Sequence, residues 1–139
     1  TEQGLNRSFI ARKSFNNEKI LTRLNAMVHP EVGADFTRWV ALHDSSPVLL
    51  KESALIFETS SHTELDQVIL VLSPSALRIK RVLARDLHRD KKDVEAIISR
   101  QLPAAETSLL AHFIIKNDER NLLLPQVLSI HKALIAQAS

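Results

Sequence analysis

The chain has 139 residues and a formal net charge of +2; 45% of its residues are hydrophobic and 24% are charged. This length and balance predict one globular domain, and so small a charge gives no support for binding to nucleic acid or to a membrane. Cysteine is absent, which excludes disulfide bonds and thiolate metal sites. The apolar runs are too short for a membrane span, and the first residues lack the apolar core of a signal peptide, so we expect a cytoplasmic protein.

Glycine is rare, since only Gly4 and Gly33 occur. A glycine-rich phosphate loop needs several glycines, which allow positive φ angles and a close approach of the backbone to phosphate. Any phosphate must therefore be bound by side chains, or by a loop that is supplied from elsewhere.

The N-terminal third, from Asn6 to Leu42, has the pattern of helices. Asn16 or Asn17 can cap a helix whose apolar residues recur at helical spacing. We expect His29-Pro30 to end this helix and the proline to open a second one, because proline has no backbone N–H to donate.

The rest of the chain alternates short apolar runs with helical segments, which predicts parallel strands in an α/β fold. The strand candidates are PVLLK (47–51), QVILVL (67–72) and HFIIK (112–116). Helices are expected at 75–85, with Ser73 as cap and Pro74 in the first position, and at about 94–98, 104–111 and 121–138. In such folds, ligands bind at the carboxyl ends of the strands.

Three arginines share one face of the helix that follows the second strand. Arg78, Arg81 and Arg85 lie at i, i+3 and i+7. Guanidinium groups bind phosphate oxygens through paired hydrogen bonds, so this face could bind a triphosphate. The alternative, which composition alone favours, is a solvated basic face paired with Asp86 and Asp90.

Two further side chains are candidates for acceptor chemistry. Glu58 follows an apolar run and could order a substrate hydroxyl or a metal-bound water, or could simply cap the next turn. His29 precedes proline, where a histidine is more often a hydrogen-bonded joint than a base. The six histidines lack the spacing of a metal site, and no nucleophile motif occurs, so we expect no metal site from them.

Five segments resemble motifs of the dephospho-coenzyme A kinase family. In chain order they are LTRLNAMVHPEV, ALIFE, RVLARD, ISRQLP and FIIKND. The corresponding family patterns are LN-x-I-x-HP-x-V, PLLFE, RV-x-x-RD, R-x-x-x-Q-x-P and x-V-I-x-N. Each match alone is weak, but the order and spacing hold across nearly the whole chain.

The sequence departs from the family pattern in three places. Ala54 replaces a proline, and residues 59–61 lack the family's glycine. The family's first strand, its phosphate loop and the aspartate motif that follows are not in the sequence. The chain therefore resembles the C-terminal two thirds of such a kinase.

The resemblance implies a three-layer P-loop kinase-like fold that contains the third, fourth and fifth strands of the family's sheet. In the family's strand order, 2-3-1-4-5, the absent first strand lies between 47–51 and 67–72. We therefore expect an N-terminal segment or a partner chain to complete the sheet. Residues 1–46 would be part of the helical acceptor domain, and 47–139 the C-terminal part of the nucleotide kinase core, with a mobile lid at about 87–103.

The resemblance also implies an activity, the ATP- and Mg²⁺-dependent phosphorylation of the 3′-hydroxyl of dephospho-coenzyme A, and no nucleic-acid or membrane partner. The fragment alone would be inactive. The implied site residues are Arg81 and Arg85 for catalysis, Arg85, Gln101 and Asn117 for ATP, and His29, Lys51 and Glu58 for the acceptor. Two alternatives stay open: a non-catalytic kinase-fold interaction domain, and a small-molecule kinase with a different acceptor.

Overall fold

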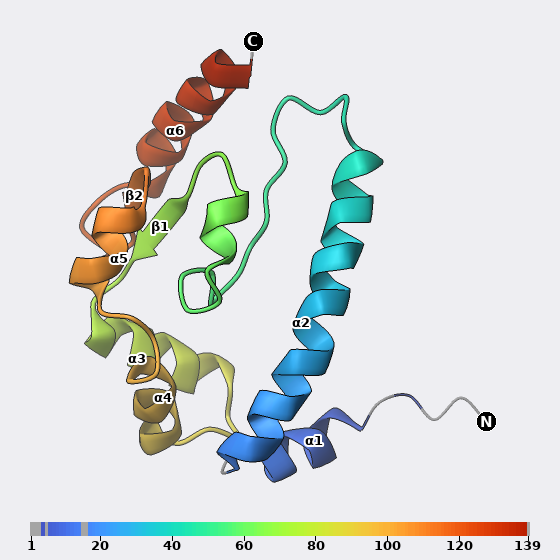
Figure 1. Ribbon diagram of the computed structural model, residues 1–139. Coiled ribbons are helices and arrows are strands. Elements are labelled where there is room, and N and C mark those ends of the chain that lie inside the picture. The colour runs from blue at the N-terminus through green and yellow to red at the C-terminus, as the bar shows by residue number, and fades with distance from the viewer. Residues whose placement is uncertain (1–3, 5, 15–16, 139) are drawn as a thin grey trace. The chain divides into compact units, whose positions relative to one another are not determined.

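The protein is seen in a computed structural model that describes residue 4, residues 6–14 and residues 17–138 (Figure 1). It consists of two compact units, residues 1–49 and residues 50–139. The first unit contains α1 (Arg7–Ser14) and α2 (Glu18–Ala41). The second contains η1 (Ser61–Glu64), β1 (Ile69–Leu72), α3 (Ser75–Arg85), α4 (Lys91–Ile98), α5 (Ala104–Leu110), β2 (Phe113–Lys116) and α6 (Leu123–Ala138). Among the described residues, no helix is long and apolar enough to cross a membrane.

Helix α2 begins where the sequence predicts but does not end there. Asn17 is its N-cap, and the side-chain oxygen of Asn17 accepts a hydrogen bond from the N–H of Ile20 at 3.2 Å. The predicted end at 29–30 is wrong, since the helix continues through Pro30. A proline inside a helix leaves the carbonyl four residues earlier, that of Ala26, without its donor. Both residues are exposed, so water can satisfy this carbonyl.

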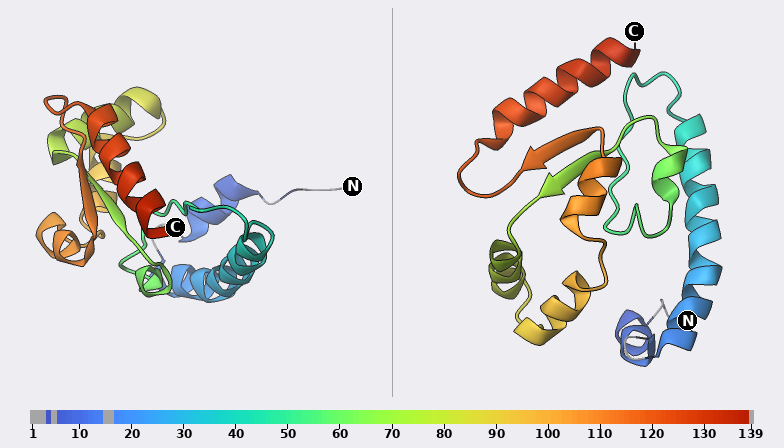
Figure 2. Two further views of the ribbon diagram at one scale, coloured as in Figure 1. Left: turned by 90° about the horizontal axis from the view of Figure 1, so that it is seen from above. Right: turned by 60° about the vertical axis from the view of Figure 1, so that its left-hand side comes forward.

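The sheet in residues 50–139 has two parallel strands, β1 and β2, in which Ile69 pairs with Phe113 and Leu72 with Lys116. The crossover between them runs through α3, α4 and α5. Helix α5 contacts β1 and helix α6 contacts β2, and Figure 2 shows these two helices on opposite sides of the strands. The predicted α/β class with parallel strands is confirmed.

The predicted strand at 47–51 is not formed. This run has no regular secondary structure, and the side chain of Leu50 is 73% exposed. An extended segment becomes a strand only when a neighbour pairs with its N–H and C=O groups. The described residues provide no such neighbour, because their sheet consists of β1 and β2 alone. The prediction of a third strand is therefore wrong for this chain.

The buried apolar side chains of residues 50–139 come from four different segments. They are Phe57 in the turn at 54–60, Val68 before β1, Val94 in α4 and Ile130 in α6. Helix α4 also packs on α3. Beyond the carboxyl ends of the two strands, the chain continues into α3 and into the loop before α6.

Candidate functional site

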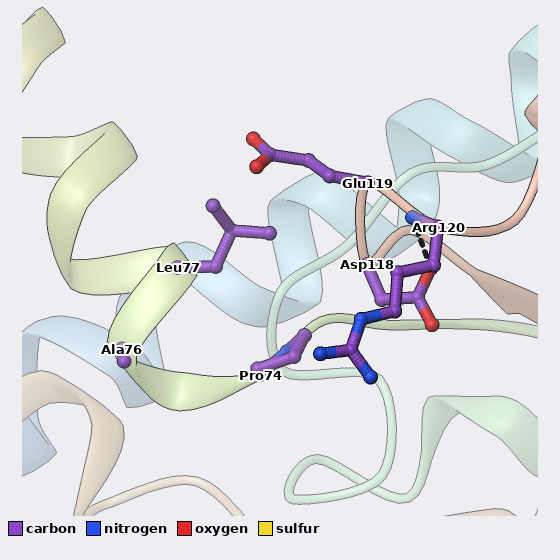
Figure 3. Close-up of a pocket in the computed structure, with 6 residues that line it drawn as sticks. All are labelled: Pro74, Ala76, Leu77, Asp118, Glu119 and Arg120. Atoms are coloured by element: carbon purple, nitrogen blue, oxygen red, sulfur yellow. Dashed lines mark hydrogen bonds between the residues drawn. The ribbon is translucent and has the colours of Figure 1, made fainter.

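The site lies just beyond the carboxyl ends of β1 and β2. The N–H of Asn117 donates to the carbonyl of Leu72 at 2.8 Å, and this is the last rung of the parallel ladder. The chain then diverges into α3 on one side and into the loop before α6 on the other. An open cavity of about 460 Å³ lies between them, lined by Pro74, Ala76, Leu77, Asp118, Glu119 and Arg120 (Figure 3).

The loop before α6 is organised by the carboxylate of Asp118. It accepts hydrogen bonds from the N–H of Arg120 at 3.0 Å and the N–H of Asn121 at 2.9 Å. The side-chain amide of Asn121 donates to it at 2.8 Å. These donors, with the N–H of Asn121 first, favour the charged form and hold the pKa of Asp118 below its usual range. The hydrogen bonds of the Asp118 carboxylate therefore hold the turn in which Asp118 itself lies.

The next residue, Glu119, has an unusual backbone. Its φ angle is 66°, in the left-handed region that favours glycine. Figure 3 shows its side chain reaching from the loop toward α3, whereas the side chain of Arg120 extends in the direction of Pro74. The two neighbours thus line different parts of the cavity.

Arg81 connects the ends of the two strands. Its Nη1 donates to the Oγ of Ser73 at 3.5 Å and to the carbonyl of Asn117 at 3.4 Å, and its Nη2 lies 3.5 Å from a carboxylate oxygen of Glu119. Ser73 is consequently not the cap of α3: the N-cap is Pro74, without a side-chain hydrogen bond. The hydroxyl of Ser73 accepts from Arg81 and does not cap the helix.

A second cluster lies where the chain returns from α4. Nη1 of Arg78 donates to the side-chain oxygen of Gln101 at 3.0 Å. The carboxylate of Glu58 accepts the N–H of Leu102 at 2.9 Å. The corner at 101–102 is therefore held from α3 on one side and from the turn at 54–60 on the other.

The other predicted site residues make none of the hydrogen bonds of these two clusters. Arg85 is exposed at the end of α3 and makes no hydrogen bond or ion pair to a described residue. Lys51 is half-buried in the irregular run before the turn, and His29 is exposed on α2, in the first unit. The two acids expected to pair with a solvated arginine face have other roles. Asp86 pairs with Arg89 at 2.7 Å, and Asp90 caps α4.

Sequence reasoning did not identify Ser73 or Glu119 as site residues. The loop at 117–120 was expected beside the nucleotide base, but nothing in the sequence marks position 119 as left-handed, because a glycine there would have been the usual signal. Within the described part of the chain, no group of three or more histidine, aspartate or glutamate side chains could hold a metal ion.

Comparison with known proteins decides the family. A family model described as Dephospho-CoA kinase matches residues 1–122. The chain belongs to the dephospho-CoA kinase family. This agrees with the five motifs, which cover the helical first unit, the arginine helix and the loop after β2.

Curated relatives share this description but are longer. The dephospho-CoA kinase of Bacteroides fragilis is 29% identical over 126 residues, which are 91% of this chain and 61% of the relative. That of Leptospira interrogans is 37% identical over 117 residues, 84% of this chain and 56% of the relative. That of Rhodopseudomonas palustris is 32% identical over 136 residues, 96% of this chain and 67% of the relative. The chain thus spans less than two thirds of the first two.

A solved structure has the same fold. The crystal structure of TT1252 from Thermus thermophilus superimposes with a TM-score of 0.80 at 27% sequence identity, over 100% of this chain and 70% of that one. The likeness extends over all of the present fragment and leaves part of the solved protein unmatched.

Proposed function

We propose that this chain is the C-terminal part of a kinase that transfers the γ-phosphoryl group of ATP to the 3′-hydroxyl of dephospho-coenzyme A, in the cytoplasm. The observation that carries the proposal is the family match over residues 1–122, which includes the arginine helix. The geometry supports it, because Arg81 lies at the carboxyl edge of parallel strands, beside an open cavity.

The residues present fit a nucleotide. A volume of about 460 Å³ is within the range of small-molecule sites. Pro74, Ala76 and Leu77 supply an apolar wall for a flat base. Arg81 and Arg85 on α3 are the cations for the phosphates. Gln101 would act at the end of the lid, and the loop that begins at Asn117 would lie beside the nucleotide base.

The proposed reaction is a phosphoryl transfer. The 3′-oxygen of the ribose forms a bond to the γ-phosphorus as the bond to the leaving oxygen of ADP breaks, and the hydroxyl proton passes to a base outside the described residues. Guanidinium groups of Arg81 and Arg85 would neutralise charge on the transferred group. Bound Mg²⁺ would supply positive charge to the phosphates, but within the described residues no group of three or more histidine, aspartate or glutamate side chains could hold it.

The acceptor side is assigned to His29, Lys51 and Glu58, with residues 1–46 as part of the acceptor domain and 47–139 as part of the nucleotide core. Glu58 already uses one carboxylate oxygen for the N–H of Leu102. Its other oxygen could meet the acceptor, so Glu58 would also connect the acceptor side to the end of the lid.

A further strand is part of this proposal. One edge of β1 pairs with β2, and the described residues place no strand on the other edge. We assign that edge to an N-terminal segment of a longer protein or to a partner chain, in keeping with the greater length of the relatives.

The proposal is tested with a protein of full family length, Mg-ATP and dephospho-coenzyme A. We expect coenzyme A to form, and Arg85→Ala to lower kcat by about 10²-fold with little change in the unfolding free energy, since Arg85 is exposed. Lys80→Ala, an exposed cation on the same helix, is the matched control and should keep its kcat. A folded protein that forms no coenzyme A would favour the non-catalytic interaction domain, or another acceptor if ATP is still consumed.

A further inference from the structure

Glu119 combines two features that are independent of each other. Its backbone has a φ angle of 66° although it is not a glycine, and strained backbone of this kind is found where function holds it. Its side chain ends 3.5 Å from Nη2 of Arg81. The left-handed turn thus directs a carboxylate to the arginine that spans the two strand ends.

The contacts of Arg81 are weak enough to be exchanged. Its three hydrogen bonds measure 3.4 to 3.5 Å, at the long limit of hydrogen-bond geometry. The side chains of Arg81 and Glu119 are 39% and 61% exposed, and ion pairs exposed to this degree contribute little and yield to competing ions.

The other charged residues of the cavity do not replace Glu119 in this contact. The carboxylate of Asp118 is occupied by the N–H groups of Arg120 and Asn121. Arg120 lies beside the same cavity, but its side chain extends in the direction of Pro74 and away from Glu119 (Figure 3). Within the described residues, Glu119 is therefore the carboxylate that competes for Arg81.

We propose that Glu119 is an internal competitor for Arg81, and that a phosphate group binds at this edge of the sheet only by displacing its carboxylate. The role rests on the proposed function, because it assigns the phosphate to the nucleotide. Glu119 then lowers the affinity of the site for polyphosphates. Tight binding therefore requires contacts to the whole nucleotide and not only the negative charge of its phosphates. It is a specificity-determining residue of the site.

The test is the binding of inorganic tripolyphosphate to this 139-residue chain at low ionic strength, followed by NMR titration of the backbone amides at 117–121. Glu119→Gln keeps the side-chain length and removes the charge. We expect it to bind tripolyphosphate about three- to tenfold more tightly than the unmodified chain. Glu119→Gly, which also suits the left-handed backbone, should gain at least as much.

Two controls separate this role from general charge. Glu95→Gln removes a carboxylate from another exposed ion pair of the same length, that with Lys91 at 3.5 Å, and should leave the affinity unchanged. In the Arg81→Ala background, Glu119→Gln should have no effect.

The inference is overturned by equal affinity of Glu119→Gln and the unmodified chain, by a gain in Glu119→Gly alone, by a gain that persists in the Arg81→Ala background, or by no binding in any variant. None of these results bears on whether the full-length protein makes coenzyme A, so the two proposals fail separately.

Discussion

Asp118 shows how one carboxylate can fix the loop that lines the cavity. Backbone N–H groups of Asn121 and Arg120 hold its pKa below the usual range. A folded-state pKa below the unfolded one adds stability at neutral pH, and this contribution disappears as the pH falls through the lowered value.

We therefore expect the unfolding free energy to fall as the pH drops below about 4, near the usual pKa of aspartate, and Asp118→Asn to remove part of this decrease. Denaturant unfolding at several pH values measures it. Asp66→Asn, at an exposed residue outside the loop, is the control and should keep the original profile. An unchanged pH profile in Asp118→Asn would contradict this role.

Gln126 closes the outer edge of β2. Its side-chain oxygen accepts the N–H of Lys116 at 2.8 Å, and its amide nitrogen donates to the carbonyls of Lys116 at 3.1 Å and Leu122 at 2.8 Å. One amide thus pairs with both outward-facing backbone groups of Lys116, as a neighbouring strand would.

Gln126→Ala leaves these backbone groups without the amide. We expect the unfolding free energy to fall by about 1 kcal/mol, the net contribution of a hydrogen bond. Gln137→Ala, at an exposed position of the same helix, should change it by less than about 0.5 kcal/mol. Equal effects of the two substitutions in denaturant unfolding would contradict an edge-closing role for Gln126.

The contacts that the sequence did not predict join distant positions. Glu58 meets the N–H of Leu102 across 44 positions, and Arg81 meets Glu119 across 38. The sequence predicts the arginine face from its helical spacing, but no local pattern reports which partner each guanidinium finds. Local signals work only where the partner is also local, as for Asn17 and Ile20.

At the scale of elements, local patterns predicted the helices well and failed in two places. The helix does not end at Pro30, because water can satisfy the exposed carbonyl that the proline leaves free. The run at 47–51 is not a strand, because strands need partners that the described residues do not contain. Both errors arise from the surroundings of a segment, namely solvent in one case and a neighbouring strand in the other. The composition of the segment itself does not determine these surroundings.

The segment at about 87–103 remains a predicted lid. Helix α4 has a capping box at Asp90 and one buried side chain, Val94, while Leu87 before it is 87% exposed. A helix attached by so few buried contacts opens more readily than paired strands.

We expect amides of α4 to exchange with solvent faster than those of β1 and β2. In a protein of full family length, Mg-ATP should slow the exchange in α4, and it should leave α6 unchanged. Hydrogen exchange measured by mass spectrometry distinguishes these cases. Protection of α4 equal to that of the strands, with or without nucleotide, would exclude a mobile lid.

At the scale of the whole molecule, the two-stranded sheet has one closed and one open edge. The carbonyls of Val68 and Leu72 accept hydrogen bonds from β2, so even-numbered residues of β1 face that strand. By the alternation of a strand, Ile69 and Val71 direct their N–H and C=O groups to the other edge. Unpaired groups of this kind invite another strand, and the match leaves about two fifths of the Bacteroides fragilis relative uncovered.

Proline substitution can test this edge, since proline removes one N–H. In the 139-residue chain, Val71→Pro should change the unfolding free energy by less than about 1 kcal/mol, because proline is tolerated at a strand edge. Leu70→Pro should cost about 3 kcal/mol, because this N–H faces β2. In a protein of full family length, the added strand would pair with Val71, so both substitutions should be costly. If Val71→Pro does not lower the unfolding free energy of this longer protein, the edge remains open, and β1 and β2 form the sheet without a further strand beside them.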